Sequence, residues 1–171
     1  MRYTVLLLAL LLMFGGCKDE SSTTPNTDNQ STTTDAQLYM LGKNAAGFTF
    51  YKNSTDTLAK NGGSGHPDSH LRTRYNAIAA QQLDANGKVK TGTVFPDSSL
   101  IVKELINNKV LTTYVFLFKK KGDSNADANG WVWAETSPSG TPTYPVTNKG
   151  AGCIGCHSTG IDYTRMNDSH P

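Results

Sequence analysis

The stretch that decides the fold reads Val-Leu-Thr-Thr-Tyr-Val-Phe-Leu-Phe and occupies residues 110–118. Valine, threonine, tyrosine and phenylalanine favour strands, and both alternating sets of side chains here are largely apolar. A strand that is apolar on both sides is typical of the middle of a sheet covered on both faces. We therefore predict that residues 110–118 form a central strand.

Further strand patterns lie before and after this stretch, at residues 71–77, 91–95, 100–106 and 131–134. A turn at Pro96-Asp97 separates the second of them from the third. In the first of them, Arg72 and Arg74 belong to a polar side that indicates exposure to solvent. Short helices are expected at residues 38–46, ended by Gly47, and at residues 77–83, and residues 61–69 have the composition of a loop. This pattern predicts an α+β domain, mainly an antiparallel sheet with a few packed helices.

The size and charge of the chain limit the remaining choices. The chain has 171 residues, 16 basic and 14 acidic side chains, and a formal net charge of +2. One ordinary domain fits this length, and we place it at residues 36–171. The longest basic run is residues 119–121, so the sequence has no electrostatic footprint for nucleic acid.

The amino-terminal residues have the pattern of an export signal. Arg2 precedes an unbroken apolar run at residues 5–14, followed by two glycines and Cys17. The run is too short to span a bilayer and is typical of a secretory signal peptide, which we place at residues 1–16. Small residues directly before a cysteine resemble the lipidation site of bacterial lipoproteins, with Cys17 as the acylated residue. The alternative is an ordinary signal peptide beside a free thiol.

We predict that residues 17–35 form a flexible tether, because the segment after Cys17 is almost wholly polar. The Lys-Asp-Glu triplet at residues 18–20 is similar to the surface-export signal of lipoproteins in Bacteroidetes-type bacteria. We therefore expect an exported lipoprotein of the outer membrane, attached through its lipid on either the periplasmic face or the cell surface.

The other two cysteines belong to the pentapeptide Cys-Ile-Gly-Cys-His at residues 153–157. This Cys-x-x-Cys-His pattern is the attachment signature of c-type haem. Its spacing lets Cys153 and Cys156 reach the two vinyl groups on one porphyrin edge, and His157 then becomes the proximal iron ligand. The motif predicts one covalent haem c.

Two other uses of the motif stay open. A redox Cys-x-x-Cys pair is expected in a thioredoxin-like βαβ setting, whereas this pair follows a loop rich in proline and glycine. A zinc site needs four ligands, and the histidines outside the motif that remain to complete one are His66, His70 and His170.

The chain resembles the cytochrome P460 family over about residues 64–164. The segments that carry the likeness, in family order, are residues 95–104, 114–119, 129–133, 153–157 and 162–163. The resemblance implies a mainly antiparallel sheet, usually a homodimer, with one haem c near the carboxy terminus. It also implies oxidation of hydroxylamine, or binding and conversion of nitric oxide, with electrons passed to an acceptor cytochrome. Related β-sheet cytochromes c′ lack the lysine link to the porphyrin that P460 members carry, and they bind small gaseous ligands.

The resemblance implies three further site residues. Lys103 occupies the place of the family lysine that is linked covalently to the porphyrin edge, and its neighbours Ile101 and Leu105 indicate an inward position. The alternative is an exposed strand lysine. Arg72 or Arg74 corresponds to the catalytic arginine. The family's glutamate is missing after the haem histidine, so Asp162 is the nearest candidate acid, or else a turn residue.

The sixth iron ligand separates the possible functions. An electron-transfer cytochrome fills this position, whereas a catalytic or gas-binding haem leaves it open. Neither Met40 nor Met166 is an obvious ligand by its position, and His66 and His70 are competitors on a loop. The leading expectation is an open haem site, and the alternative is a gas-binding protein or an electron carrier.

Overall fold

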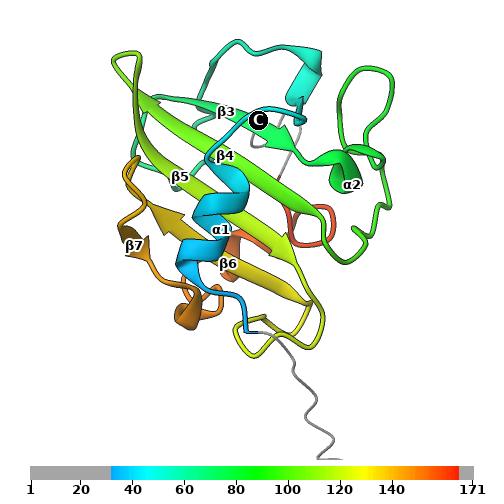
Figure 1. Ribbon diagram of the computed structural model, residues 1–171. Helices are drawn as coiled ribbons and strands as arrows, with labels where there is room; N and C mark the ends of the chain where they lie inside the picture. The colour runs from blue at the N-terminus through cyan, green and yellow to red at the C-terminus, as the bar shows by residue number, and fades with distance from the viewer. Residues whose placement is uncertain (1–31, 166–171) are drawn as a thin grey trace, which may run out of the picture.

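A computed structural model describes residues 32–165 of the chain (Figure 1). The predictions made for the signal peptide, for Cys17 and most of the tether, and for Met166 and His170 lie outside these residues.

Seven strands form one antiparallel sheet, in the order β1-β3-β4-β5-β6-β7 with β2 paired to β3. The sheet and the short helices confirm the predicted α+β class. The strands are β1 (Thr49–Phe50), β2 (Leu58–Ala59), β3 (His70–Tyr75), β4 (Leu100–Asn107), β5 (Val110–Lys119), β6 (Trp131–Thr136) and β7 (Pro142–Tyr144). Residues 110–118 fall within β5, which pairs with β4 on one side and β6 on the other. The prediction of a central strand is therefore confirmed.

The helices are short and lie on both sides of the sheet. They are α1 (Asp35–Gly42), α2 (Ala77–Ala80), α3 (Ile154–His157) and the 3₁₀ helices η1 (Tyr51–Asn53) and η2 (Val146–Asn148). Figure 1 shows α1 lying across the near face of the sheet, with the red carboxy-terminal segment behind the sheet.

Two apolar clusters divide the core, one on each face of the sheet. The α1 face holds one cluster, made by Leu38, Leu100, Val102, Phe116, Val132 and Ala134 among others. The opposite face, here called the α3 face, holds the other, which includes Leu71, Ile101, Leu105, Leu117, Trp131 and Trp133. Cys153 and Ile154 pack against this second cluster. The alternation of side chains along β4 and β5 thus places the Cys-x-x-Cys-His motif on the face away from α1.

The junction of α1 with the preceding chain is well anchored. Thr34 and Gln37 form a capping box at the start of the helix, which satisfies amide groups that have no partner inside the helix. The backbone N–H and the hydroxyl of Thr33 both donate to the carboxylate of Asp123, at 2.8 and 2.6 Å. Residues at the predicted end of the tether are therefore held against the loop between β5 and β6.

Several predicted elements differ from the structure. Residues 91–95 form no strand, because a turn with Gly92 at φ +75° precedes an extended segment that leads into Pro96. The first helix begins earlier than residue 38 and ends at Gly42, where a side chain would collide with the ring of Phe116. The second helix, α2, ends at Ala80 and is shorter than predicted. The expected solvent exposure of the polar side of β3 is wrong, since Arg74 is buried there.

Within residues 32–165, none of the helices has both the length and the apolar character needed to cross a bilayer.

Candidate functional site

The Cys-x-x-Cys-His motif forms the short helix α3, with Cys153 at its amino-terminal cap. Cys153 is half-buried, Cys156 is exposed, and neither forms a disulfide. Gly150, at φ +77°, brings this segment close to the sheet, because a side chain there would lie 2.8 Å from the indole nitrogen of Trp133 and 2.9 Å from Ile154. Gly150 thus allows a close approach of this segment to β6.

The imidazole of His157 is buried and held in one orientation. Its ring lies edge-on to Trp133, with 4.9 Å between the ring centroids. Its Nδ1 lies 3.2 Å from the backbone carbonyl oxygen of Tyr163, which can only accept a hydrogen bond. The Arg165 backbone N–H lies 3.5 Å from the same nitrogen, at the limit of hydrogen-bond distance. The shorter contact places the proton on Nδ1 and the lone pair on Nε2, the tautomer that binds a metal through Nε2.

A cavity of about 170 Å³ opens beside the motif. Its lining includes His66, Glu135, Cys153, Cys156, His157 and Arg165. These residues come from the loop before β3, from β6, from α3 and from the carboxy-terminal segment. The predicted loop at residues 61–69 therefore contributes to the site through His66.

Burial keeps both histidines of the cavity neutral at pH 7. It lowers the pKa of His66 to about 4, helped by the positive charge of Lys103. Burial and the charge of Lys103 also lower the pKa of His157 to about 4, although the hydrogen bond to Tyr163 acts in the opposite direction. A neutral imidazole is the form that ligates a metal.

Lys103 lies in β4 on the α3 face and is only 2% exposed. It is paired in register with Thr73 of β3 and Val115 of β5. Burial, and then the nearby charge of Arg165, lower the pKa of Lys103 to about 7. The inward position indicated by the sequence is confirmed, and a large fraction of Lys103 is a neutral amine near neutral pH. The covalent link to a porphyrin remains a prediction.

The two candidate arginines lie on the other face of the sheet. Arg74 donates from Nε to Glu104 at 3.0 Å and from its terminal nitrogens to the carbonyl oxygens of Gly42 and Asn44. Arg72 donates to the second oxygen of Glu104 at 2.7 Å. The structure does not bring either arginine together with the motif.

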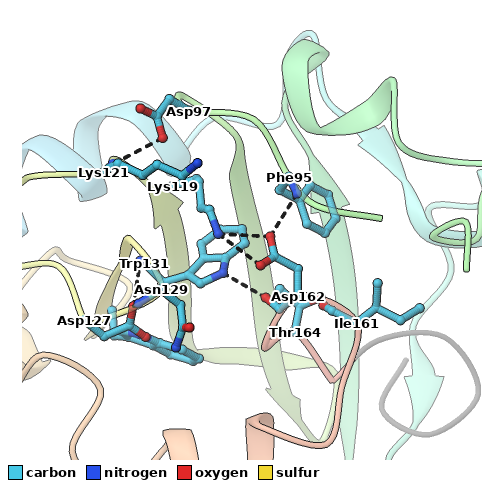
Figure 2. Close-up of polar contacts among 11 residues, drawn as sticks. Phe95, Asp97, Lys119, Lys121, Asp127, Asn129, Trp131, Ile161, Asp162 and Thr164 are labelled. Atoms are coloured by element: carbon cyan, nitrogen blue, oxygen red, sulfur yellow. Dashed lines mark hydrogen bonds and ion pairs between the residues drawn. The ribbon is translucent and has the colours of Figure 1, made fainter. Parts of the chain in front are cut away.

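Asp162 lies in a turn that joins the carboxy-terminal segment to the sheet (Figure 2). Its carboxylate accepts from the Lys119 ammonium, with both oxygens at 3.0 Å, and from the backbone N–H of Phe95 at 2.8 Å. The lining of the cavity does not include it. Of the two sequence-based interpretations of Asp162, this geometry favours the turn residue.

Glu135 is the acid in the cavity, and sequence reasoning missed it. Burial raises the pKa of its carboxyl group, and one oxygen lies 4.0 Å from Nδ1 of His66. A signal was present, since Glu135 follows Trp131 and Trp133 at every second position of β6 and so lies on the face that they direct toward the apolar core. An acid at an inward position of a strand is unusual and marks a candidate functional site.

The other candidate axial ligands lie away from the cavity. His70 is exposed at the start of β3, and its Nδ1 lies 2.9 Å from the hydroxyl of Ser69. Met40 is exposed on α1, which covers the opposite face. Only His66 among the sequence candidates in the described residues shares the cavity with His157.

The residues present fit the attachment of a c-type haem. The orientation and tautomer of His157 suit an iron ligand held by a backbone carbonyl. The exposure of Cys156 leaves the mouth of the cavity accessible, and a porphyrin, which is larger than the cavity, would have to extend through this mouth. Burial raises the pKa of the Cys153 thiol, which is unfavourable for a redox nucleophile. Among residues 32–165, no group of three or more His, Cys, Asp or Glu side chains is arranged to hold a metal ion, so the zinc alternative gains no support there.

Fold and site together define an α+β protein with one antiparallel sheet and a Cys-x-x-Cys-His motif packed on one face. No model of a known protein family matches the chain, and a search of curated proteins finds no significant match. The likeness to the cytochrome P460 family therefore rests on the residues quoted above.

Proposed function

We propose that the protein is an exported, lipid-anchored mono-haem c protein of the cytochrome P460 type, acting on hydroxylamine or nitric oxide. One observation carries the proposal: the Cys-x-x-Cys-His motif packs against a sheet face on which Lys103 is buried, with His157 held by the Tyr163 carbonyl. The cavity beside the motif supplies room and polar groups for a small nitrogenous ligand.

Three residues would hold the cofactor. Cys153 and Cys156 would form the thioether bonds, and Nε2 of His157 would ligate the iron. When bound, the haem would supply a redox-active iron that accepts electrons from a small ligand and passes them to an acceptor cytochrome. Cys17 would carry the lipid that attaches the chain to the membrane. A homodimer is a further expectation from the resemblance.

Glu135 is the residue that we assign to proton transfer. Oxidation of hydroxylamine releases protons, so a proton acceptor is needed close to the substrate. Its carboxylate lies in the cavity, and burial moves the pKa of this group upward, toward the working pH. This assignment replaces Asp162, whose carboxylate is bound to Lys119.

Lys103 is the candidate for the covalent link to the porphyrin edge. Its electrostatic effect on both His66 and His157 supports a position close to the two imidazoles. With a pKa of about 7, much of the side chain is in the neutral form that a nucleophilic amine requires.

A second candidate function is binding or electron transfer without turnover. His66 favours it, because this imidazole is neutral at pH 7 and lines the same cavity as His157. A histidine in the sixth position would make the protein an electron carrier. A gas-binding protein would instead leave that position open and lack the lysine link.

The absorption spectrum of the protein, matured with a haem-attachment system, tests these functions. A strongly red-shifted Soret band in the reduced protein is expected for the cross-linked enzyme. An ordinary high-spin spectrum would indicate the gas binder, and sharp low-spin bands the electron carrier. Absence of haem from the matured protein would contradict the whole proposal.

The lysine link has its own test. We expect Lys103→Ala to shift the Soret band toward an ordinary position and to remove the mass of the linked peptide from digests. Lys121→Ala, at an exposed position, serves as the control and should change neither. An unchanged spectrum and peptide mass in Lys103→Ala would contradict the link.

A further inference from the structure

The carboxy-terminal turn after α3 carries the carbonyl group that orients His157. Tyr163 provides this carbonyl, and Asp162 and Tyr163 both have left-handed backbone angles, at φ +46° and +60°. Two successive residues other than glycine rarely adopt this conformation without support from their surroundings. The support must therefore come from contacts of the turn with the rest of the fold.

Asp162 supplies this support from both its side chain and its backbone. Its carboxylate binds Lys119 at the end of β5 and the N–H of Phe95, and its carbonyl oxygen accepts from the indole N–H of Trp131 at 2.8 Å. Figure 2 shows the carboxylate and the carbonyl of Asp162 directed toward these partners. Three separate parts of the fold therefore fix the residue directly before Tyr163.

The cluster is buried, so these contacts are well protected from water. The Lys119 side chain is 2% exposed and that of Asp162 is 10% exposed. The Lys119 ammonium also lies 4.6 Å from the centre of the Trp131 ring, which favours a cation. Removing the charge of Asp162 would leave the ammonium of Lys119 buried without its carboxylate, so the turn would have to rearrange.

We propose that Asp162, with Lys119 and Trp131, is a positioning residue that sets the tautomer and orientation of His157 through the carbonyl of Tyr163. This inference rests on the proposed function in that His157 is the iron ligand. The hydrogen bond from Nδ1 to a fixed carbonyl makes the imidazole a stronger ligand through Nε2. Asp162 thus acts on the haem site without touching the cavity.

The test compares Asp162→Asn with Asp97→Asn. Asp97 is exposed and accepts a hydrogen bond from the backbone N–H of Lys121, so its variant changes the same chemical group away from the turn. In the matured ferrous protein, we expect Asp162→Asn to lower the iron–histidine stretching frequency in resonance Raman spectra and to raise the midpoint potential. Asp97→Asn should leave both values unchanged.

Nitrogen-15 NMR of the imidazole in the haem-free full chain provides a readout that does not need the cofactor. Wild type should show His157 protonated mainly on Nδ1, and Asp162→Asn should lose much of this population to Nε2. If the wild-type protein binds no haem, the proposed function fails, while the tautomer measurement still decides the inference.

Trp131→Phe covers the case in which Asp162→Asn does not fold. It keeps an aromatic ring and removes only the N–H donor to Asp162, so we expect a smaller shift in the same direction. Circular dichroism establishes that each variant is folded. The inference is overturned if folded Asp162→Asn keeps the wild-type tautomer of His157. If Asp162→Asn does not fold, the same result for folded Trp131→Phe overturns it. An equal shift in Asp97→Asn would also overturn it.

Discussion

Two buried basic residues on neighbouring strands, Arg74 on the α1 face and Lys103 on the α3 face, have very different electrostatic surroundings. Arg74, on the α1 face, is 0% exposed, and burial lowers its pKa while the carboxylate of Glu104 raises it again. Carbonyl oxygens of Gly42 and Asn44 accept its other hydrogen bonds. Lys103, on the α3 face, is equally buried, but the other charge that affects its pKa is Arg165, which lowers it further.

The difference separates the structural ion-pair network around Arg74 from the candidate functional site near Lys103. The α1 face keeps its charges and balances them with an acid, which makes the network part of the core. The α3 face carries the Lys103 amine and the two imidazoles of the cavity, all with lowered pKa values, although its Lys119–Asp162 pair is balanced like the network of the α1 face. Buried ionisable groups with shifted pKa values reduce stability, and they are concentrated at functional sites. Removing the acid that binds Arg74 and removing the amine of Lys103 should therefore have opposite effects on stability.

The largest effect is expected for Glu104→Gln. This variant leaves Arg74, and partly Arg72, without the carboxylate that binds both. We expect the free energy of unfolding to fall by about 4 kcal/mol, as for other buried ion pairs that lose one partner. Urea unfolding at pH 7 measures it. Asp56→Asn, at an exposed site, should stay within about 0.5 kcal/mol of wild type, and an equally small change in Glu104→Gln would contradict the structural role of the network.

Lys103→Met should act in the opposite direction and stabilise the haem-free chain. Because the pKa of Lys103 falls from 10.5 to about 7 on folding, burial of the charged form costs stability at neutral pH. We expect a gain on the order of 3 kcal/mol at pH 7. Wild-type stability should then rise with pH between about 7 and 10.5, because the unfolded chain binds the proton that the folded chain lacks.

The gain from Lys103→Met should therefore shrink as the pH increases over this range. Denaturant unfolding of both proteins at several pH values measures the difference. Lys121→Met, at an exposed position, is the matched control and should show no such trend. A loss of stability in Lys103→Met would mean that the charge of Lys103 is balanced in the fold as that of Arg74 is.

Asp123→Asn tests the anchor of α1 with a smaller effect. Burial alone would raise the pKa of Asp123, but hydrogen bonds from Thr33, Asn125 and Lys120 lower it from 3.8 to about 2. Its ionised form therefore contributes about 2 kcal/mol, fully present above about pH 4 and lost as the pH falls toward 2. The variant should be less stable than wild type by this amount at pH 7 and equal to it near pH 2. Thermal unfolding at both pH values checks the expectation, and a difference that persists at pH 2 would refute it.

Glu135→Gln should have the smallest effect on stability and a large one on function. Because burial raises the pKa of Glu135, removing its charge should stabilise the fold slightly at pH 7. If the matured protein oxidises hydroxylamine, turnover should fall about a hundredfold, the usual contribution of a proton acceptor. Stopped-flow assays across pH measure it, with Asp56→Asn as the control. Unchanged turnover would remove Glu135 from the reaction.

The sequence was most informative where a local pattern was strong. Alternation predicted β5 and most of β4, and the neighbours of Lys103 indicated its inward position, because the side chains of a strand alternate between the two faces. The spacing of the Cys-x-x-Cys-His motif is also local. What could not be predicted depends on strand register, which decides that Arg72 is opposite Glu104 and that Thr73 is opposite Lys103.

The acids of the site show the same limit. Asp162 was chosen for its closeness to His157 in sequence, but it binds Lys119, which lies far away along the chain. Glu135 was missed because its approach to His66 depends on how the loop before β3 folds over the sheet. The polar side of β3 indicated that Arg74 is exposed, but the segment after α1, which comes from a distant part of the sequence, surrounds its guanidinium group.

The anchoring of Thr33 to Asp123 also has a mechanical consequence. A pull on the chain ahead of residue 32 would first load the two hydrogen bonds to the Asp123 carboxylate, before it reached the first turn of α1. Because Asp123 lies in the connection between β5 and β6, the force would pass into the middle of the sheet. The first load on the folded part would thus fall on the central strands and not on the first turn of α1.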